Sequence, residues 1–246
     1  MPGLIVLQKK VKRQTTFRII IYGTLAVALL CMAWVLTRQP KPLFVHFRLE
    51  DYELKVIRCA PGMDSLSDVK DTYGKGLELA MNGGIFDPKF APLGHLVIEG
   101  SQLSETNRAD GEGNFYMKPN GVFYVDKYSA RILPTEEYDY ETIRPTTAIQ
   151  SGPLLIKDGS IHPALNPSSR NRYTRNGIGI TRDGRICIGF FETPCSLHQM
   201  AMAFLKEGCV SALYLDGAIS GIVRGDLEIN SDQKFSTFVV LLNAKN

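Results

Sequence analysis

The longest apolar run in the chain spans residues 19–37, which read IIIYGTLAVALLCMAWVLT. It contains no charged residue, and Arg18 and Arg38 stand directly before and after it. A helix rises about 1.5 Å per residue, so a run of this length matches a hydrocarbon core about 30 Å thick. Tyr22 and Trp34 lie toward its two ends, where interfacial aromatic residues are favoured. The pattern therefore predicts a transmembrane helix over residues 19–37.

The residues on either side of this run predict its orientation. Five basic residues precede it, and an excess of Lys and Arg marks the cytoplasmic side of a membrane span. We therefore expect residues 1–18 to form a basic cytoplasmic tail, residues 38–42 a short linker and the C-terminal body to be exported. In a bacterium this would be a single-pass inner-membrane protein with a periplasmic body. A cleaved signal peptide is the alternative, but it needs a shorter apolar region and a small-x-small cleavage site, which the following residues do not offer.

Beyond the linker, apolar positions alternate in short runs, as in β-strands with one buried face. Residues 43–57 alternate on both sides of Glu50-Asp51, so they are predicted to form a hairpin that turns at that dipeptide. Two more tight hairpin turns are expected at Asp158-Gly159 and Asp183-Gly184. Further strands are predicted at residues 77–81, 95–98, 121–125, 154–156, 177–181, 185–191, 210–215 and 238–242.

Two helices are predicted, over residues 65–73 and 196–207. Each begins with a serine that is followed three residues later by Asp or Gln, which is the pattern of a capping box, and each ends before a glycine. The residues concerned are Ser65, Asp68 and Gly74 in the first helix, and Ser196, Gln199 and Gly208 in the second. Residues 43–246 contain no second linker and no repeat. We therefore expect a single α+β domain, mostly β with a few helices, preceded by one N-terminal transmembrane helix.

The charge of the chain is unevenly distributed. The formal net charge is +3, but residues 1–38 hold six basic residues and no acidic one, which leaves 22 basic and 25 acidic residues in the remainder. The body therefore lacks the basic field that nucleic-acid binding requires. Its hydrophobic and charged fractions, 44% and 22% of the whole chain, are ordinary for a globular protein.

The body contains four cysteines, Cys59, Cys187, Cys195 and Cys209, and a fifth lies in the apolar run. An even number in an exported domain permits disulfide bonds, and Cys187 and Cys195 are near enough in sequence to close a small loop. Buried thiols are an equal alternative. No pair of cysteines has the spacing of a zinc site.

Two glycine-containing stretches at strand ends are candidates for ligand contact. The first is AMNGGIFDP, in which the strand ends at Asn82, Gly83 and Gly84 follow it, and Asp87 comes next among the polar residues. The second is IQSGPLLIKDG, in which Ser151 and Gly152 precede a buried strand. Glycine lets a backbone turn sharply or approach a ligand closely, and Ser151 and the Gly152 N–H could bind a phosphate or sugar oxygen. Plain turns are the alternative explanation for both stretches.

Charged residues next to apolar strands form two further candidates. The stretch SSRNRYTRNGIGI contains Arg170, Arg172 and Arg175, of which Arg175 adjoins the apolar strand and is the better candidate for binding phosphate. Asp216 follows the predicted strand 210–215, and Glu192 occupies an equivalent place after the run ICIGFF. Carboxylates at strand ends are held rigidly by the sheet, which suits an active site. A turn between two strands is the simpler explanation of Asp216.

Taken in order, these stretches resemble the phosphodiester glycosidase family over about residues 77–242. The matching blocks are MNGGIF, PLGHLVIEG, FYMKPNGVFYV, QSGPLLIKDG, TRNGIGI and LYLDGAIS. The family has an Asp-Gly-Gly-x-Ser block where this chain has Asp216, Gly217, Ala218, Ile219 and Ser220. Ala218 therefore replaces a glycine, and Ile219 adds bulk. Asn176 likewise stands where the family usually has threonine.

The resemblance implies hydrolysis of a sugar-1-phosphodiester in an exported or envelope glycan, so the expected partner is a phosphorylated or phosphodiester-linked glycan. It also implies the roles of the site residues. Asp216 would be the carboxylate at the anomeric carbon, with Glu192 or Asp87 as the alternative for that role, and Arg175 would act on the phosphate. Asn82 would orient sugar hydroxyls or another side chain, and Ser151 and Ser220 would be neutral donors.

Two other classes of function are open on the sequence. One is a non-catalytic glycan-binding domain tethered to the membrane, which the altered Ala218-Ile219 block would suit. The other is a structural partner of an envelope assembly. No cofactor is required by the sequence. A divalent cation could use Asp216, Asp87 or Glu192, since hard cations take oxygen ligands, but the spacing establishes no metal site.

Overall fold

The computed structural model describes residues 22, 24, 27, 41–127, 129–217 and 219–244. The predicted transmembrane helix over residues 19–37 lies outside these residues, apart from three positions. Among the described residues, no helix is both long and apolar enough to cross a membrane. The chain divides into a unit of residues Met1–Lys41 and a unit of residues Pro42–Asn246, and the second unit contains all the strands.

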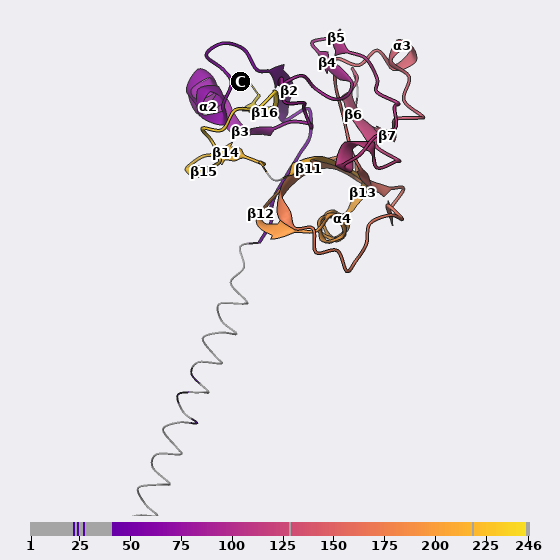
Figure 1. Ribbon diagram of the computed structural model, residues 1–246. Helices are drawn as coiled ribbons and strands as arrows, with labels where there is room; N and C mark the ends of the chain where they lie inside the picture. Colours follow the sequence, from indigo (N-terminus) through magenta and orange to yellow (C-terminus); the bar gives the residue numbers. More distant parts are fainter. Residues whose placement is uncertain are drawn as a thin grey trace, which may run out of the picture. The chain divides into compact units, whose positions relative to one another are not determined.

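Three antiparallel sheets make up the second unit (Figure 1). The first has the order β1 (Leu43–Phe47), β12 (Ile186–Cys195), β11 (Tyr173–Thr181), β13 (Cys209–Gly217), β9 (Leu154–Lys157) and β10 (Ser160–Ile161). The second has the order β15 (Leu227–Ile229), β14 (Ile222–Arg224), β3 (Leu77–Asn82), β16 (Thr237–Asn243) and β2 (Tyr52–Arg58). The third has the order β5 (Ser101–Ser104), β4 (Leu96–Ile98), β8 (Thr147–Ser151), β6 (Gly121–Val125) and β7 (Ala130–Pro134).

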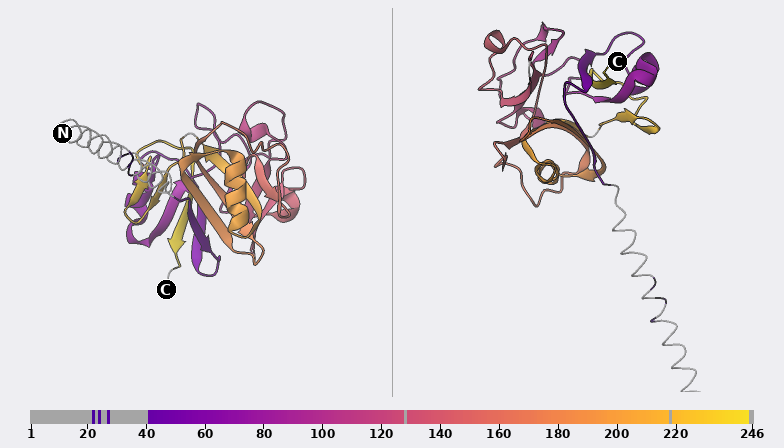
Figure 2. Two further views of the ribbon diagram at one scale, coloured as in Figure 1. Left: turned by 90° about the horizontal axis from the view of Figure 1, so that it is seen from below. Right: turned by 180° about the vertical axis from the view of Figure 1, so that it is seen from behind.

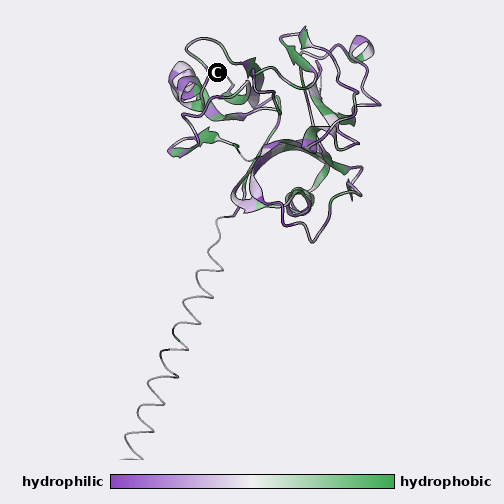
Figure 3. Ribbon diagram, in the orientation of Figure 1, coloured by the Kyte–Doolittle hydropathy of each residue, from purple (hydrophilic) through white to green (hydrophobic). Residues whose placement is uncertain are grey.

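All three sheets turn one face toward a shared hydrophobic core. Ile178 from the first sheet, Leu79 from the second and Phe123 from the third are each completely buried in it. Figure 3 shows hydrophobic residues along the strands of each sheet. Burying such surface stabilises the fold by about 25 cal/mol per Å², so the shared core holds the three sheets together.

Helices lie against the outer faces of the sheets. The outer face of the first sheet packs against α4 (Leu197–Lys206), as the left view of Figure 2 shows. The second packs against α2 (Leu66–Tyr73), and the short α3 (Tyr140–Ile143) contributes to a cluster outside the third. This arrangement confirms a mostly β domain with few helices.

The predicted helix ends are confirmed. The Ser65 and Ser196 side chains accept hydrogen bonds from the backbone N–H groups three residues later, and the side chains at those positions, Asp68 and Gln199, bond back to the serine N–H groups. Gly74 and Gly208 follow the two helices with φ of +53° and +83°, a conformation that glycine adopts without strain. The hairpin turns at Asp158-Gly159 and Asp183-Gly184 are also present.

The predicted hairpin over residues 43–57 is wrong. Both strands exist, but β1 pairs with β12 in the first sheet and β2 pairs with β16 in the second. Alternation identifies a strand with one buried face, yet it does not select the partner strand. The strands that sequence reasoning missed, β5, β7, β8, β10, β14 and β15, have no more than five residues each.

The four cysteines of the body are free thiols. A small loop between Cys187 and Cys195 is excluded, because both residues lie on β12 and eight residues of strand extend about 26 Å. Cys187 and Cys209 are close enough to interact, and that hydrogen bond together with burial raises the pKa of the Cys187 thiol. Both side chains are buried, which is typical of inert structural thiols.

Candidate functional site

Each sheet contributes a polar residue near a strand end to one buried network. Asn82 ends β3 in the second sheet, Ser151 ends β8 in the third, and Asp216 is the last residue but one of β13 in the first. The Asn82 Nδ2 donates to Asp216 Oδ2 at 3.0 Å, and the Ser151 Oγ donates to the carbonyl oxygen of Leu215 at 2.8 Å. The three sheets therefore meet at the Asp216 segment.

Asp216 is a buried carboxyl group with an unusual pKa. Its side chain is held by Asn82 on one oxygen and by the Gly217 N–H, at 2.6 Å, on the other. Burial raises the pKa of Asp216 to about 7, although both hydrogen bonds and the charge of Arg175 act to lower it. The carboxyl group can therefore gain or lose a proton near neutral pH, as acid–base chemistry requires.

Asn176 fixes the geometry around Asp216. Its Oδ1 accepts the Asp216 N–H at 3.0 Å, and its Nδ2 donates to Asn82 Oδ1 at 2.7 Å. The Gly221 N–H also donates to Asn82 Oδ1, at 2.9 Å, so the Asn82 amide is oriented with its Nδ2 toward Asp216. Sequence reasoning noted Asn176 only as a departure from the family. Asparagine inside a buried strand, where it is disfavoured, was the available signal.

Arg175 is a buried cation with an unused donor. Its side chain is 1% exposed, and its guanidinium carbon lies 5.4 Å and 5.3 Å from the ring centroids of Tyr173 and Tyr214. The Nε donates to the carbonyl oxygen of Cys195 at 2.8 Å, and Nη2 donates to Asn171 Oδ1 at 2.9 Å. Among the described residues, Nη1 has no hydrogen-bond partner and no carboxylate lies within ion-pair distance. A buried charge without an ion pair is costly, so an anionic ligand at Nη1 would complete this site.

Arg175 lines a cavity of about 120 Å³. Amide, hydroxyl and imidazole groups surround it, together with a few apolar side chains. The lining residues are Asn114, Met117, Ala164, Leu165, Asn166, Ser169, Asn171, Arg175, Leu197 and His198. Sequence reasoning singled out only Arg175 among them, because the others come from loops and from the start of α4 with no common motif. The cavity suits a small anion that is held by Arg175 and neutral donors.

Gly217 brings its backbone close to both Arg175 and Tyr214. A Cβ at this position would lie 2.2 Å from the Tyr214 hydroxyl and 3.0 Å from Arg175 Nη1. Burial raises the pKa of Tyr214 to about 12, so its hydroxyl remains protonated and can donate. Position 217 therefore requires glycine, because any side chain there would clash with the Tyr214 hydroxyl.

The remaining predicted binding residues support the network or its surroundings. The Ser220 hydroxyl is buried and donates to the Asp216 carbonyl oxygen at 3.1 Å. Gly83 and Gly152 permit close packing, because a Cβ would lie 2.3 Å from Thr237 Oγ1 and 2.6 Å from the Phe115 carbonyl oxygen respectively. The hydroxyls of Ser151 and Ser220 therefore both donate to backbone carbonyl oxygens. Their roles as direct phosphate donors stay predictions.

The structure does not bring the other two predicted carboxylates into this network. Asp87 is part of a turn, in which its Oδ1 accepts the N–H groups of Lys89 and Ala91 at 2.7 Å and 2.9 Å. Glu192 is exposed on β12, two residues beyond the buried Phe190, and its role as the alternative to Asp216 stays a prediction. In the described part of the chain, no group of three His, Cys, Asp or Glu residues could hold a metal ion.

A buried carboxyl group with a strongly raised pKa, next to a buried cation, marks this junction of three sheets as the candidate functional site. Residues 75–237 match the family model described as phosphodiester glycosidase. Since this match covers more than half of the chain, the protein belongs to the phosphodiester glycosidase family. All the site residues discussed above from Asn82 to Ser220 lie inside the matched region.

One curated relative aligns with part of the chain. The uncharacterized protein YigE of Escherichia coli strain K12 is 37% identical over 146 residues, an alignment that covers 58% of this chain and 57% of YigE. The chain thus matches a little over half the length of this relative.

Two solved structures share the fold. The catalytic domain of zebrafish N-acetylglucosamine-1-phosphodiester alpha-N-acetylglucosaminidase, auto-inhibited by its pro-peptide, superimposes with a TM-score of 0.59 at 15% identity and covers 83% of both chains. A hypothetical protein from Synechocystis superimposes with a TM-score of 0.53 at 14% identity, over 82% of this chain and 59% of that chain. At these identities the similarity shows the fold alone.

Proposed function

We propose that the protein hydrolyses a sugar-1-phosphodiester at Asp216, in an exported or envelope glycan. One observation carries the proposal: a buried carboxyl group with a pKa of about 7 lies near a buried arginine that has an unused donor. Membership of the family supports the same reaction class. The zebrafish structure, whose name specifies an N-acetylglucosamine-1-phosphodiester, supports an anomeric phosphodiester as the bond that is cleaved.

The chemistry of such a substrate fits the two charged groups. A phosphate ester is a good leaving group at an anomeric carbon, so little general-acid assistance is needed. The ionised Asp216 can take a proton from the attacking water or stabilise the oxocarbenium-like transition state. Arg175 and the neutral donors of the cavity can stabilise the charge on the departing phosphate, and a preorganised buried site does this more effectively than water.

The backbone and amide groups prepare Asp216 for this role. Asn82 and the Gly217 N–H stabilise the ionised carboxylate, and Asn176 holds the strand end that carries it. Without these contacts, burial alone would raise the pKa further and leave too little carboxylate at neutral pH. In this proposal Asn82 has the second of its two predicted roles, orientation of an active-site side chain.

Hydrolysis can be tested directly on purified protein. N-acetylglucosamine-1-phosphate methyl diester, its monoester and a simple methyl glycoside would be incubated with the protein, and released sugar would be measured. We expect turnover of the diester that is abolished in Asp216→Asn. Binding of the diester without release of sugar would instead select the non-catalytic glycan-binding function, and full activity of Asp216→Asn would remove Asp216 from the mechanism.

We also propose that residues 19–37 anchor the domain in a membrane with the body on the exported side. The proposal rests on the uncharged run and on the five basic residues that precede it. Protease treatment of intact spheroplasts tests it. We expect digestion of the body from outside the cell, whereas protection of the body together with cytoplasmic proteins would contradict the proposed topology.

A further inference from the structure

The two terminal nitrogens of the Arg175 guanidinium group lie beside different parts of the chain. Nη1 adjoins the Asp216 segment, because a Cβ at Gly217 would be 3.0 Å from it. Nη2 donates to the carbonyl oxygen of Asn171 at 3.3 Å and to its Oδ1 at 2.9 Å. A phosphate bound at Nη1 therefore has the carboxyl group of the proposed reaction on one side and the loop before β11 on the other.

This loop carries two more arginines. Arg170 and Arg172 are exposed and stand directly before and after Asn171. Consecutive Cα atoms are about 3.8 Å apart, so both arginines start one residue away from the contact with Nη2. The Asn171 N–H donates to Ser169 Oγ at 3.2 Å, and these two residues line the cavity beside Arg175. The loop thus forms one wall of the cavity and holds Arg170 and Arg172 beside it.

Arg172 acts on the same strand end as Arg175. The Cys195 carbonyl oxygen accepts a hydrogen bond from Arg175 Nε at 2.8 Å. Burial raises the pKa of the Cys195 thiol to about 11, and the charges of Arg175 and Arg172 both act to lower it. Screening by salt at physiological ionic strength becomes strong only beyond about 8 Å, so two cations near one residue can act on a single ligand.

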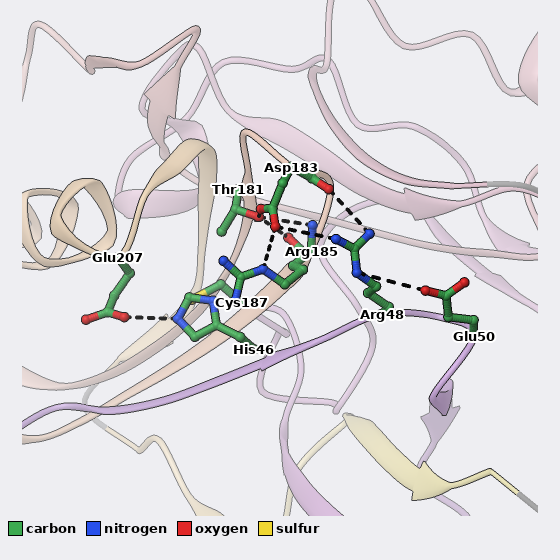
Figure 4. Close-up of polar contacts among 8 residues, drawn as sticks. All are labelled: His46, Arg48, Glu50, Thr181, Asp183, Arg185, Cys187 and Glu207. Carbon is green, nitrogen blue, oxygen red and sulfur yellow. Dashed lines mark hydrogen bonds and ion pairs between the residues drawn. The ribbon is translucent and has the colours of Figure 1, made fainter.

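None of these three arginines has a carboxylate partner in the described part of the chain. Two arginines at the opposite end of the first sheet differ in this respect (Figure 4). There Arg48 Nη2 lies 3.5 Å from Asp183 Oδ2, and Arg185 Nε lies 2.8 Å from the same oxygen. The end of the sheet that carries Asp216 is therefore left with positive charges that no described carboxylate pairs with.

The neighbouring groups do not neutralise these charges. Glu192 is exposed on β12, where its carbonyl oxygen accepts the Thr174 hydroxyl at 3.1 Å, and its carboxylate forms no ion pair with a described residue. At the cavity, α4 begins with Leu197 and His198, and its first turn contains no acidic residue. The positive end of the helix dipole therefore adds to the charge around the cavity.

A simple phosphodiester does not match this charge. It carries one negative charge, which Arg175 alone can neutralise. Binding surfaces are complementary in charge to their ligands, so the two remaining arginines indicate a ligand with more negative charge than one diester. Phosphate suits them, because the planar guanidinium group matches phosphate oxygens bidentately.

We infer that the substrate carries a second phosphate on the alcohol side of the cleaved bond, and that Arg170 and Arg172 bind it. The inference rests on the proposed hydrolase function. The substrate class is a sugar-1-phosphodiester whose alcohol is itself phosphorylated, or a sugar-1-diphosphate ester. Water forms the new bond to the anomeric carbon and gives a proton to Asp216, while the bond from that carbon to the phosphate oxygen breaks. Both phosphates leave together with the electron pair.

Binding can be measured without turnover. Orthophosphate and pyrophosphate are titrated into the purified full-length protein in a calorimeter. We expect pyrophosphate to bind about tenfold more tightly or better, because it adds charge-assisted hydrogen bonds to the loop arginines. Arg170→Gln/Arg172→Gln should abolish most of this preference. The control Arg131→Gln/Arg182→Gln removes the same charge at two exposed arginines elsewhere and should keep it.

Kinetics locate the second phosphate. The substrates are the methyl diester of N-acetylglucosamine-1-phosphate, the corresponding 2-phosphoethyl diester and the methyl ester of N-acetylglucosamine-1-diphosphate. We expect Arg170→Gln/Arg172→Gln to lower kcat/KM on one or both substrates with two phosphates about tenfold more than on the methyl diester. The substrate that is affected identifies the spacing of the two phosphates.

Two results would overturn the inference. One is an equal loss of kcat/KM on all three substrates, which would mean that the loop arginines act on the cleaved phosphate. The other is equal affinity of the wild type for orthophosphate and pyrophosphate. Absence of turnover on all three substrates by the wild type would instead overturn the hydrolase function, and the calorimetric comparison would still report whether the loop arginines bind a second phosphate.

Discussion

Asn82 and Asp216 are 134 positions apart in the sequence, yet the Asn82 amide donates a hydrogen bond of 3.0 Å to the Asp216 carboxylate. The first residue ends a strand of the second sheet, and the other lies near the end of a strand of the first. The packing of the two sheets therefore brings Asn82 to Asp216, and their contact lowers the pKa of this buried acid. Because it stabilises the charged form, it counteracts the effect of burial on the pKa.

The rate of diester hydrolysis should depend on the ionisation of Asp216. With a pKa of about 7, half of the carboxyl groups are ionised near neutral pH. We expect kcat/KM to rise about tenfold per pH unit below pH 7 and to level off above it, because the ionised form is the active one. A rate that instead falls as the pH rises through 7 would indicate that the protonated carboxyl group acts as a general acid.

Removal of the Asn82 amide should move this profile to higher pH. In Asn82→Ala the carboxylate loses a donor that favours its charged form, so we expect the midpoint to rise by about one pH unit, or about 1.4 kcal/mol. The same substitution at the exposed Asn243, at the end of β16, is the matched control and should leave the midpoint unchanged. A midpoint that does not move in Asn82→Ala contradicts the role assigned to Asn82.

The buried carboxyl group should also make stability depend on pH. Its pKa in the folded protein is raised to about 7 from a usual value near 3.8. The folded state therefore binds more protons than the unfolded state between these values, and the free energy of unfolding falls as the pH rises from about 4 to 7. Below this range both states are protonated and the effect vanishes. Above it, the loss reaches about 4 kcal/mol.

Comparison with Asp216→Asn isolates this contribution. We expect the stability of Asp216→Asn relative to wild type to increase steadily between pH 4 and pH 7, as measured by urea unfolding at several pH values. Asp226→Asn, which changes an exposed carboxylate, controls for the general effect of charge. A stability difference between Asp216→Asn and wild type that is independent of pH would show that Asp216 is not a perturbed group.

Arg175→Met should separate function from stability. The methionine side chain fills much of the same space and removes a buried charge that has no described carboxylate partner, so we expect the free energy of unfolding to change by no more than about 2 kcal/mol. Hydrolysis of the diester should fall by about 100-fold or more, because the charge on the leaving phosphate is no longer stabilised. The exposed Arg182→Met is the control in kinetic and urea-unfolding assays. Strong destabilisation with retained activity would indicate a purely structural role.

Gly217→Ala should disturb the site mainly through a clash with Tyr214. The added Cβ would lie 2.2 Å from the Tyr214 hydroxyl, so we expect a loss of about 1–3 kcal/mol in stability and a clear fall in activity. In the double variant Gly217→Ala/Tyr214→Phe the clashing oxygen is absent, and much of the lost stability should return. A double-mutant cycle on unfolding free energies measures this coupling. Strictly additive effects would mean that the Tyr214 hydroxyl is not what excludes a side chain at position 217.

Local sequence signals predicted the elements around the site well. The serine caps of α2 and α4 were predicted because capping involves residues only three positions apart. The core strand that ends near Asp216 was predicted because its apolar positions repeat within a few residues. The hairpin over residues 43–57 failed for the opposite reason, since each strand pairs with a partner more than 100 positions away.

The sequence by itself determined ten of the sixteen strands and the two capped helices, the family blocks and the positions of Asn82, Arg175 and Asp216 as polar residues at or beside strand ends. It also determined that residues 19–37 form an uncharged apolar run. Only the tertiary structure decided that Asn82, Asn176 and Asp216 form one network and that Arg175 is buried with a free donor. It also placed Leu43 and Asp216 in one row of paired residues across the first sheet, through Phe190 and Asn176. Hydrogen bonding, burial and register depend on chain segments that are distant in sequence, and no local pattern encodes which of these segments meet.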